Sequence, residues 1–251
     1  MGWGARILIF LTLFWGAWTA EVSAAPIPKR YRLGFQTGLA YQIYNEIHPL
    51  QNTRGARDLR QTLLTLQFDY FYYLFSDVVI VGFRGFYTPM ALATNSTAGK
   101  SLSLMNAAAQ LGLELPILPR PWILCLMAGG FYNTTFSSSA YLGYQNITGP
   151  EFYPTLRWVS EASGSAGFSA DLYYKFSPVM SVGGFTVANR VWSAGANLRI
   201  PVSGRFKYPE YAFQRALVVG VEYSDLYYDF QLIRNVRMSS QLLKLTAGVE
   251  F

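Results

Sequence analysis

Apolar and polar residues alternate along much of this chain, and the alternation predicts β-strands. In "YRLGFQTGLAYQIY", which begins at Tyr31, the apolar residues fall on odd positions, while Arg32 and Gly34 fall on even ones. Alternation with a period of two is typical of a strand whose two faces meet different surroundings. The same period recurs at 63–74, 78–87, 105–116, 122–133, 161–176, 179–188, 191–200, 213–225 and 237–251. The pattern therefore predicts ten strands.

The segments between these strands differ in length. Turn residues predict tight connections at 75–77, 116–121 and 177–178. Longer segments lie between them at 45–58, 89–102 and 134–160. Short periplasmic turns and longer extracellular loops are the layout of an antiparallel transmembrane β-barrel, with both termini periplasmic. The segment 201–212 is long for a periplasmic turn, so eight or twelve strands also fit.

Composition supports a membrane-facing surface. Hydrophobic residues make up 51% of the chain and charged residues only 14%, whereas a soluble domain has about 25% charged residues. A lipid-facing surface or a very large core would account for this shortfall. In a membrane no strand edge can stay unpaired, so an all-β sheet of this kind must close into a barrel.

The first 24 residues read as a cleaved secretory signal peptide, with a basic start, a short apolar run and small residues before the cut. The barrel domain is then 25–251. The chain has one cysteine, so no intramolecular disulfide can form. That residue, Cys125, lies within an apolar strand and is expected to be a packed, inert thiol.

The parity of the strands directs ten charged residues into the barrel, five of each sign. Buried charges are tolerable only when they are paired, and barrels of about eight strands have interiors filled by side chains. The sequence therefore predicts a cross-linked polar network of Arg32, Asp69, Arg84, Glu114, Asp171, Lys175, Arg199, Glu222, Lys244 and Glu250. Arg157 lies in the segment 134–160 and is assigned to the outer loops.

Glycines recur on this inward parity, which predicts room for large inward side chains. Aromatic residues on the outward parity predict two girdles at the membrane interfaces. The periplasmic girdle is expected to contain Tyr31, Tyr72, Trp122, Tyr174, Phe176 and Phe251. The outer girdle is expected to contain Tyr41, Tyr87, Tyr132, Trp192 and Tyr223.

The last ten residues, "LLKLTAGVEF", alternate to the end and finish on an aromatic residue. With the signal peptide and the alternating strands, they make the chain resemble a Gram-negative outer-membrane β-barrel protein. The resemblance implies location in the cell outer membrane, among lipopolysaccharide and phospholipid. It also implies that the barrel-assembly machinery reads the terminal strand through Leu245, Ala247, Gly248, Val249 and Phe251.

The sequence offers little for catalysis. Outer-membrane enzymes of this architecture generally use a histidine, and the one histidine here is His48, in "NEIHPLQN". No serine motif or aspartate pair stands beside it, so a solvated loop histidine is the favoured interpretation. No metal site or cofactor is expected, and no basic cluster indicates nucleic-acid binding.

Three functions remain open. The favoured one is a non-enzymatic barrel whose loops, chiefly 134–160, bind a surface partner or support the membrane. The alternative is a narrow porin-like channel for small solutes or ions. The least favoured is a lipid-modifying hydrolase that uses His48.

The terminal strand provides a first test. Phe251→Ala, or a short polar extension after Phe251, should lower the yield of assembled barrel because the assembly signal is damaged. The measurement is the heat-modifiable fraction of the protein in electrophoresis of outer membranes. Normal heat-modifiable migration of both variants would contradict the prediction.

Overall fold

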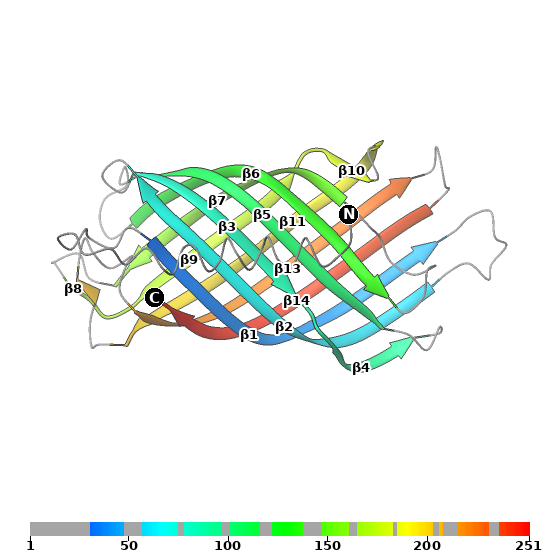
Figure 1. The fold of residues 1–251 in the computed structure, drawn as a ribbon, viewed down its shortest axis with the longest axis horizontal. Coiled ribbons are helices and arrows are strands. Elements are labelled where there is room, and N and C mark those ends of the chain that lie inside the picture. The colour runs from blue at the N-terminus through cyan, green and yellow to red at the C-terminus, as the bar shows by residue number, and fades with distance from the viewer. Residues whose placement is uncertain are drawn as a thin grey trace, which may run out of the picture.

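The alternating segments form strands that pair edge to edge around a closed antiparallel barrel in this computed structural model (Figure 1). Among the residues that the structure describes, no helix is long and apolar enough to cross a membrane. The described residues are 31–47, 57–74, 78–96, 101–115, 122–137, 147–160, 165–182, 185–202, 206–207, 215–230 and 236–251. The predicted signal peptide and His48 lie outside them.

Fourteen strands are present in the described part of the chain. Their bounds are β1 Tyr31–Ile47, β2 Arg57–Leu74, β3 Val79–Tyr87, β4 Ala91–Ser96, β5 Leu102–Leu115, β6 Trp122–Ser137, β7 Ile147–Val159, β8 Ser165–Ala166, β9 Ser169–Ser177, β10 Met180–Val182, β11 Phe185–Pro201, β12 Phe206–Lys207, β13 Ala216–Phe230 and β14 Val236–Glu250.

The barrel closes between its first and last strands. Leu39 of β1 lies opposite Leu64 of β2 on one side and Leu245 of β14 on the other. The backbone of Phe251 exchanges two hydrogen bonds with Leu33, so the pairing runs to the last residue. β3 and β4 both pair with the same edge of β2, and β9 and β10 both lie between β7 and β11. β3 and β4 together make one interrupted strand of the wall, and β9 and β10 together make another. The wall therefore has the predicted ten strands.

The strand count is confirmed, but the predicted boundaries are wrong between 134 and 188. β7 lies inside the segment that was expected to be one long loop. The segments 161–176 and 179–188 do not form two wall strands; β9 and β10 form one, and Ser177–Pro178 interrupts it instead of turning the chain. Pro150 and Pro154 concealed β7, because proline within an alternating segment argues against a wall strand.

The two ends of the barrel carry different connections. We call the end at which β1 begins and β14 ends the terminal end, on the left of Figure 1. The opposite end, where β4 and β10 lie, is the loop end. The long connection after β11 contains β12, which pairs with β8 at the terminal end, so the unusual length of 201–212 hides no extra wall strand.

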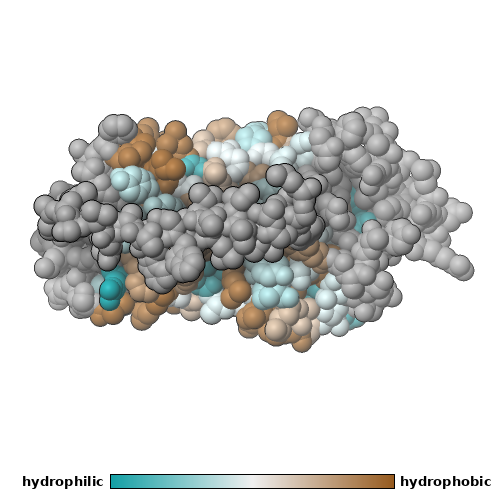
Figure 2. Space-filling model, viewed as in Figure 1, coloured by the Kyte–Doolittle hydropathy of each residue, from teal (hydrophilic) through white to brown (hydrophobic). Residues whose placement is uncertain are grey.

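The outer face of the wall is apolar. Leu66, Leu111 and Leu245 are 45%, 59% and 56% exposed, so the predicted outward parity is confirmed. Figure 2 shows apolar residues over much of the visible described surface. A closed sheet with this outer face suits a lipid environment.

Aromatic rings follow the outer face. At the terminal end, the ring centroids of Trp122 and Trp158 lie 6.5 Å apart, and Tyr31 stacks on Tyr70. The prediction that Tyr174 and Phe176 belong to this end is wrong. Tyr174 stacks on both Phe176 and Trp192, with its ring centroid 6.1 Å from that of Trp192. The registers place these rings near the middle of the wall, because Phe176 lies opposite Phe152 of β7 and Trp192 of β11 and the strand continues beyond it into β10.

Inward glycines serve two purposes. A Cβ on Gly82 would lie 2.9 Å from the Phe71 ring, so this glycine gives room to an inward side chain, as the sequence predicts. A Cβ on Gly129 would lie 1.9 Å from the carbonyl oxygen of Ala109 on the neighbouring strand. That overlap is with backbone, so a side chain there would force the two strands apart.

The contrast gives a second prediction. Gly129→Ala should destabilise the barrel by more than about 3 kcal/mol, because no side-chain rotation relieves a clash with backbone. Gly34→Ala is the matched control, since its Cβ would meet nothing closer than 3.4 Å. The measurement is the free energy of unfolding in urea, with the barrel in lipid vesicles. Equal stability of the two variants would contradict the prediction.

Candidate functional site: the filled interior of the barrel

The ten charged residues predicted to face inward lie in the interior, and each has an oppositely charged partner within 4.0 Å. The pairs are Arg32–Glu250, Arg199–Glu250, Asp69–Arg84, Glu114–Arg157, Asp171–Arg157, Lys175–Glu222 and Lys244–Glu222. They occupy two levels of the barrel.

The level nearer the terminal end is organised by two carboxylate–arginine groups. Arg157 binds Asp171 through two hydrogen bonds of 2.7 and 3.2 Å, and its other terminal nitrogen lies 3.2 Å from Glu114. Glu250 accepts a 2.6 Å hydrogen bond from Arg199. Planar guanidinium groups suit such multiple contacts with carboxylates.

The assignment of Arg157 to the outer loops is therefore wrong. Its exposed fraction is 3%, and it is the common partner of Glu114 and Asp171. Sequence reasoning missed Arg157 because β7 was not recognised, although its parity within "PTLRWV" matches that of an inward residue.

The second level lies near the middle of the barrel. Arg84 Nε is 2.9 Å from Asp69 Oδ1, and its guanidinium carbon lies 4.4 Å from the centre of the Tyr153 ring. Glu222 binds three donors: the Tyr173 hydroxyl at 2.9 Å, Lys244 Nζ at 2.5 Å, and Lys175. These contacts keep buried charges paired, which is what makes such a layer tolerable.

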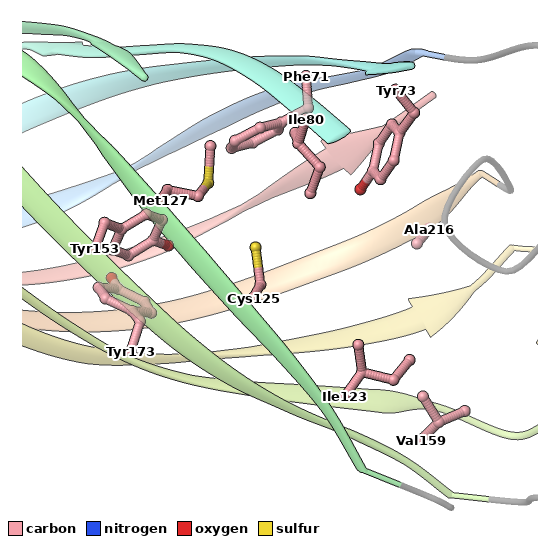
Figure 3. Packing of buried hydrophobic residues seen from close by; sticks show 10 residues of the cluster. All are labelled: Phe71, Tyr73, Ile80, Ile123, Cys125, Met127, Tyr153, Val159, Tyr173 and Ala216. Atoms are coloured by element: carbon pink, nitrogen blue, oxygen red, sulfur yellow. The ribbon is translucent and has the colours of Figure 1, made fainter. Parts of the chain in front are cut away.

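Apolar side chains also fill the interior, in two clusters that the sequence did not predict. The terminal-end cluster consists of Phe71, Tyr73, Ile80, Ile123, Cys125, Met127, Tyr153, Val159, Tyr173 and Ala216 (Figure 3). The loop-end cluster consists of Tyr44, Leu59, Leu102, Ala108, Phe131, Ile147, Met180, Leu226 and Met238. The terminal-end cluster is interleaved with the charged level at that end, since Ile123 lies opposite Arg157 and Phe71 opposite Arg32. The interior is therefore filled by charged and apolar side chains that lie side by side.

Cavities of modest size lie among the described residues of the interior. A cavity of about 70 Å³ lies between the loop-end cluster and the charged residues Glu151, Lys175 and Glu222. Two others measure about 20 and 30 Å³. The last is lined by Arg32 and Arg84, which have buried nitrogens without a hydrogen-bond partner, and it is large enough for about two water molecules.

The described residues offer little catalytic chemistry. No group of three or more metal-ligating side chains occurs among them. Cys125 is buried in the terminal-end cluster, as the sequence predicts, with Met127 and Ile80 around it in Figure 3.

Comparison with known proteins relates the chain to others by fold alone. No protein-family model matches it. No curated protein matches it in sequence. Among solved structures, the outer membrane protease OmpT from Escherichia coli has a TM-score of 0.56 at 12% identity, over 91% of this chain and 98% of that one. The fold is that of a Gram-negative outer-membrane β-barrel.

Two further solved barrels are less similar. The outer membrane protein AlkL has a TM-score of 0.40 at 13% identity, over 93% of this chain and 97% of that one. OprG from Pseudomonas aeruginosa has a TM-score of 0.36 at 11% identity, over 88% and 95%. The fold, the apolar outer face and the charged interior place this barrel in the outer membrane.

The paired charges give a third prediction. Arg84→Gln should lower the free energy of unfolding by about 3 kcal/mol, because it leaves Asp69 buried without its ionic partner. Adding Asp69→Asn to the same chain should recover part of that loss, because the remaining charge is then removed. Urea titration of each variant in vesicles measures both effects. A double variant less stable than the sum of the two single losses would contradict this account.

Proposed function

We propose that this protein is a non-enzymatic outer-membrane barrel that is closed to solutes and acts through its surface or its mechanical support of the membrane. The observation that supports this function most strongly is the filled interior. A molecule moving along the axis would meet the loop-end cluster, the paired charges near the middle, and the level where the terminal-end cluster and the other charged groups interleave. The cavity between the loop-end cluster and the middle charges measures about 70 Å³.

The charged levels support closure because they are bound to several strands at once. Arg157, on β7, binds Glu114 on β5 and Asp171 on β9. Glu222, on β13, binds side chains from β9 and β14. Opening a path through either level would leave charges buried without partners, which costs several kcal/mol for each pair broken.

The partners follow from this function. Lipopolysaccharide and phospholipid surround the wall, and the assembly machinery engages the terminal strand. A surface ligand would bind the connections at the loop end. Of the predicted loop 134–160, residues 138–146 and Ser160 lie outside β6 and β7, so the connection 138–146 is the part available for such a role.

No enzymatic activity is proposed. The similarity to an outer membrane protease is one of fold at 12% identity, and it carries no activity over to this chain. The hydrolase hypothesis depends on His48, which has no nucleophile motif beside it in the sequence.

Conductance in planar bilayers gives the fourth prediction. The purified barrel should show no steady single-channel conductance, because each level of the interior is filled. Phe131→Ala, which removes a large side chain from the loop-end cluster, should not by itself open a channel, since the charged levels stay intact. Leu111→Ala on the lipid face is the matched control.

Two outcomes would contradict the proposal. Steady porin-like conductance of the unaltered protein would favour the narrow channel. Lipid turnover by the purified protein that is lost in His48→Ala would favour the hydrolase.

A further inference from the structure

The wall of the barrel is not hydrogen-bonded evenly at the loop end. β3 and β5 pair as far as Tyr87 and Met105. One step further, the carbonyl oxygen of Leu104 accepts a 2.9 Å hydrogen bond from the backbone nitrogen of Thr88. The backbone nitrogen of Leu104 donates a 2.6 Å hydrogen bond to the Thr88 hydroxyl. Beyond that point β4 pairs with β2 and, within the described part of the chain, has no ladder with β5. We call this interruption between β4 and β5 the seam.

A side chain replaces the missing strand pairing at the seam. The amide of Gln61, on β2, donates a 2.8 Å hydrogen bond to the carbonyl oxygen of Leu102 and accepts a 3.1 Å bond from its backbone nitrogen. Both groups of Leu102 would otherwise be bonded to the neighbouring wall strand. Gln61 is 2% exposed, so its amide crosses to β5 on the inside of the barrel.

The same amide belongs to a chain of polar side chains. Gln61 also donates to Gln42 at 2.6 Å, and Gln42 donates to the Ser240 hydroxyl at 2.8 Å. These bonds link β5 to β2, β1 and β14 across the interior. At Leu102 the seam is therefore closed by one side-chain amide, in place of the backbone ladder of a neighbouring strand.

Apolar residues lie on both sides of the seam. Inside, Ala40, Leu63, Leu104 and Leu242 form a cluster against which Phe86 and Ala91 pack. Outside, Met90 and Leu92 are 52% and 54% exposed. The cavity of about 70 Å³ is lined by Phe86, Leu104 and Leu242, so the apolar cluster on the inside of the seam reaches the cavity wall.

The height of the seam matches the edge of the membrane. β3 rises from the terminal end over Val79–Tyr87, which for a tilted strand spans roughly 25 Å, about the height of the apolar band of such barrels. The ring of Tyr87 meets that of Phe136 edge-on at 6.4 Å, at the level where interfacial aromatic residues are expected. The seam therefore faces the outer leaflet near its polar boundary.

We propose that the seam is a lateral entry through which the end of a lipid alkyl chain occupies the cavity behind it. Lipid is the occupant because it surrounds this face of the wall, and the apolar lining on both sides gives an alkyl chain a continuous path. The cavity is about half the size of one that holds benzene, so it takes only a few terminal carbons. Glu151, Lys175 and Glu222 line its other side and stop the chain from going deeper.

The test uses photo-crosslinking of the folded barrel in phosphatidylcholine vesicles. The probe is a fatty acid with a diazirine at the end of its chain, and peptide mass spectrometry locates the residues that it labels. Neighbouring residues on opposite faces make the result sharp: Leu104 faces the interior and Met105 the lipid. The seam predicts labelling of Leu104, Leu63 or Phe86 in addition to lipid-facing residues.

Two variants test the path itself. Gln61→Ala should raise labelling of Leu104 about fivefold, because losing one ordinary hydrogen bond shifts the equilibrium between the closed and open seam by about that factor. Ala40→Leu adds bulk to the buried cluster between the seam and the cavity, and it should abolish labelling of Leu104 while leaving Met105 labelled. Heat-modifiable migration checks that each variant is folded, and the unaltered protein tests the proposal without any substitution.

Three outcomes would overturn the proposal. Labelling confined to outward residues such as Met105 and Leu92 would mean that the seam admits no chain. Equal labelling of Ile80 and Ile123, which lie inside the terminal half, would mean that the probe enters without using the seam. Unchanged labelling in Gln61→Ala would mean that its amide does not close the path. The labelling pattern does not depend on whether the barrel conducts ions, so the lateral-entry proposal can fail independently of the proposed function.

Discussion

The requirement that each backbone amide and carbonyl finds a partner inside the membrane determines the rest of this structure. A sheet can meet it only by closing on itself, and here the backbone of Phe251 pairs with Leu33 to complete the circle. Closure divides each strand between lipid and a narrow interior. A charge on the inward parity cannot reach bulk water easily, so it must find its counter-charge among a few neighbouring strands.

The interior answers this constraint by packing apolar side chains beside paired charges. The carboxylate groups bound by Arg157 and Arg199 lie nearer the terminal end, and Glu222 with its lysines lies near the middle. Aromatic rings pack on the cations, as Tyr153 does on Arg84 and Phe86 on Lys244. The apolar side chains beside these pairs limit access of water to them. In such surroundings a paired charge is strongly held, while removing one partner is costly. The arrangement suits a rigid, closed barrel better than an open path.

At the seam, a side chain satisfies backbone hydrogen-bonding groups that the neighbouring strand would otherwise satisfy. One glutamine amide has a donor and an acceptor in the same geometry as a peptide group, so Gln61 can satisfy both backbone groups of Leu102. A ladder rung made by a side chain can be withdrawn without unfolding a strand. That property separates this point of the wall from the backbone ladders beside it, such as the one between β1 and β2.

The sequence by itself determined the closed antiparallel barrel and, within most of its strands, the inward direction of the charged residues. These follow from a period of two, which is a local property of each strand. It also placed Arg32, Asp69 and the other inward charges correctly, because parity alone decides their direction. It failed at β7, where Pro150 and Pro154 interrupt the local pattern although the neighbouring strands hold the segment in the wall.

Only the tertiary structure decided which charges pair, where the aromatic rings meet, and where the wall is weak. Arg157 joins Glu114 and Asp171 because strands β5 to β9 are staggered to bring them to one level, and stagger is set by register around the whole barrel. The contact of Tyr174 with Trp192 depends on the same register. The bond from Gln61 to Leu102 joins residues 41 positions apart, and no local pattern reports the end of a ladder between two other strands.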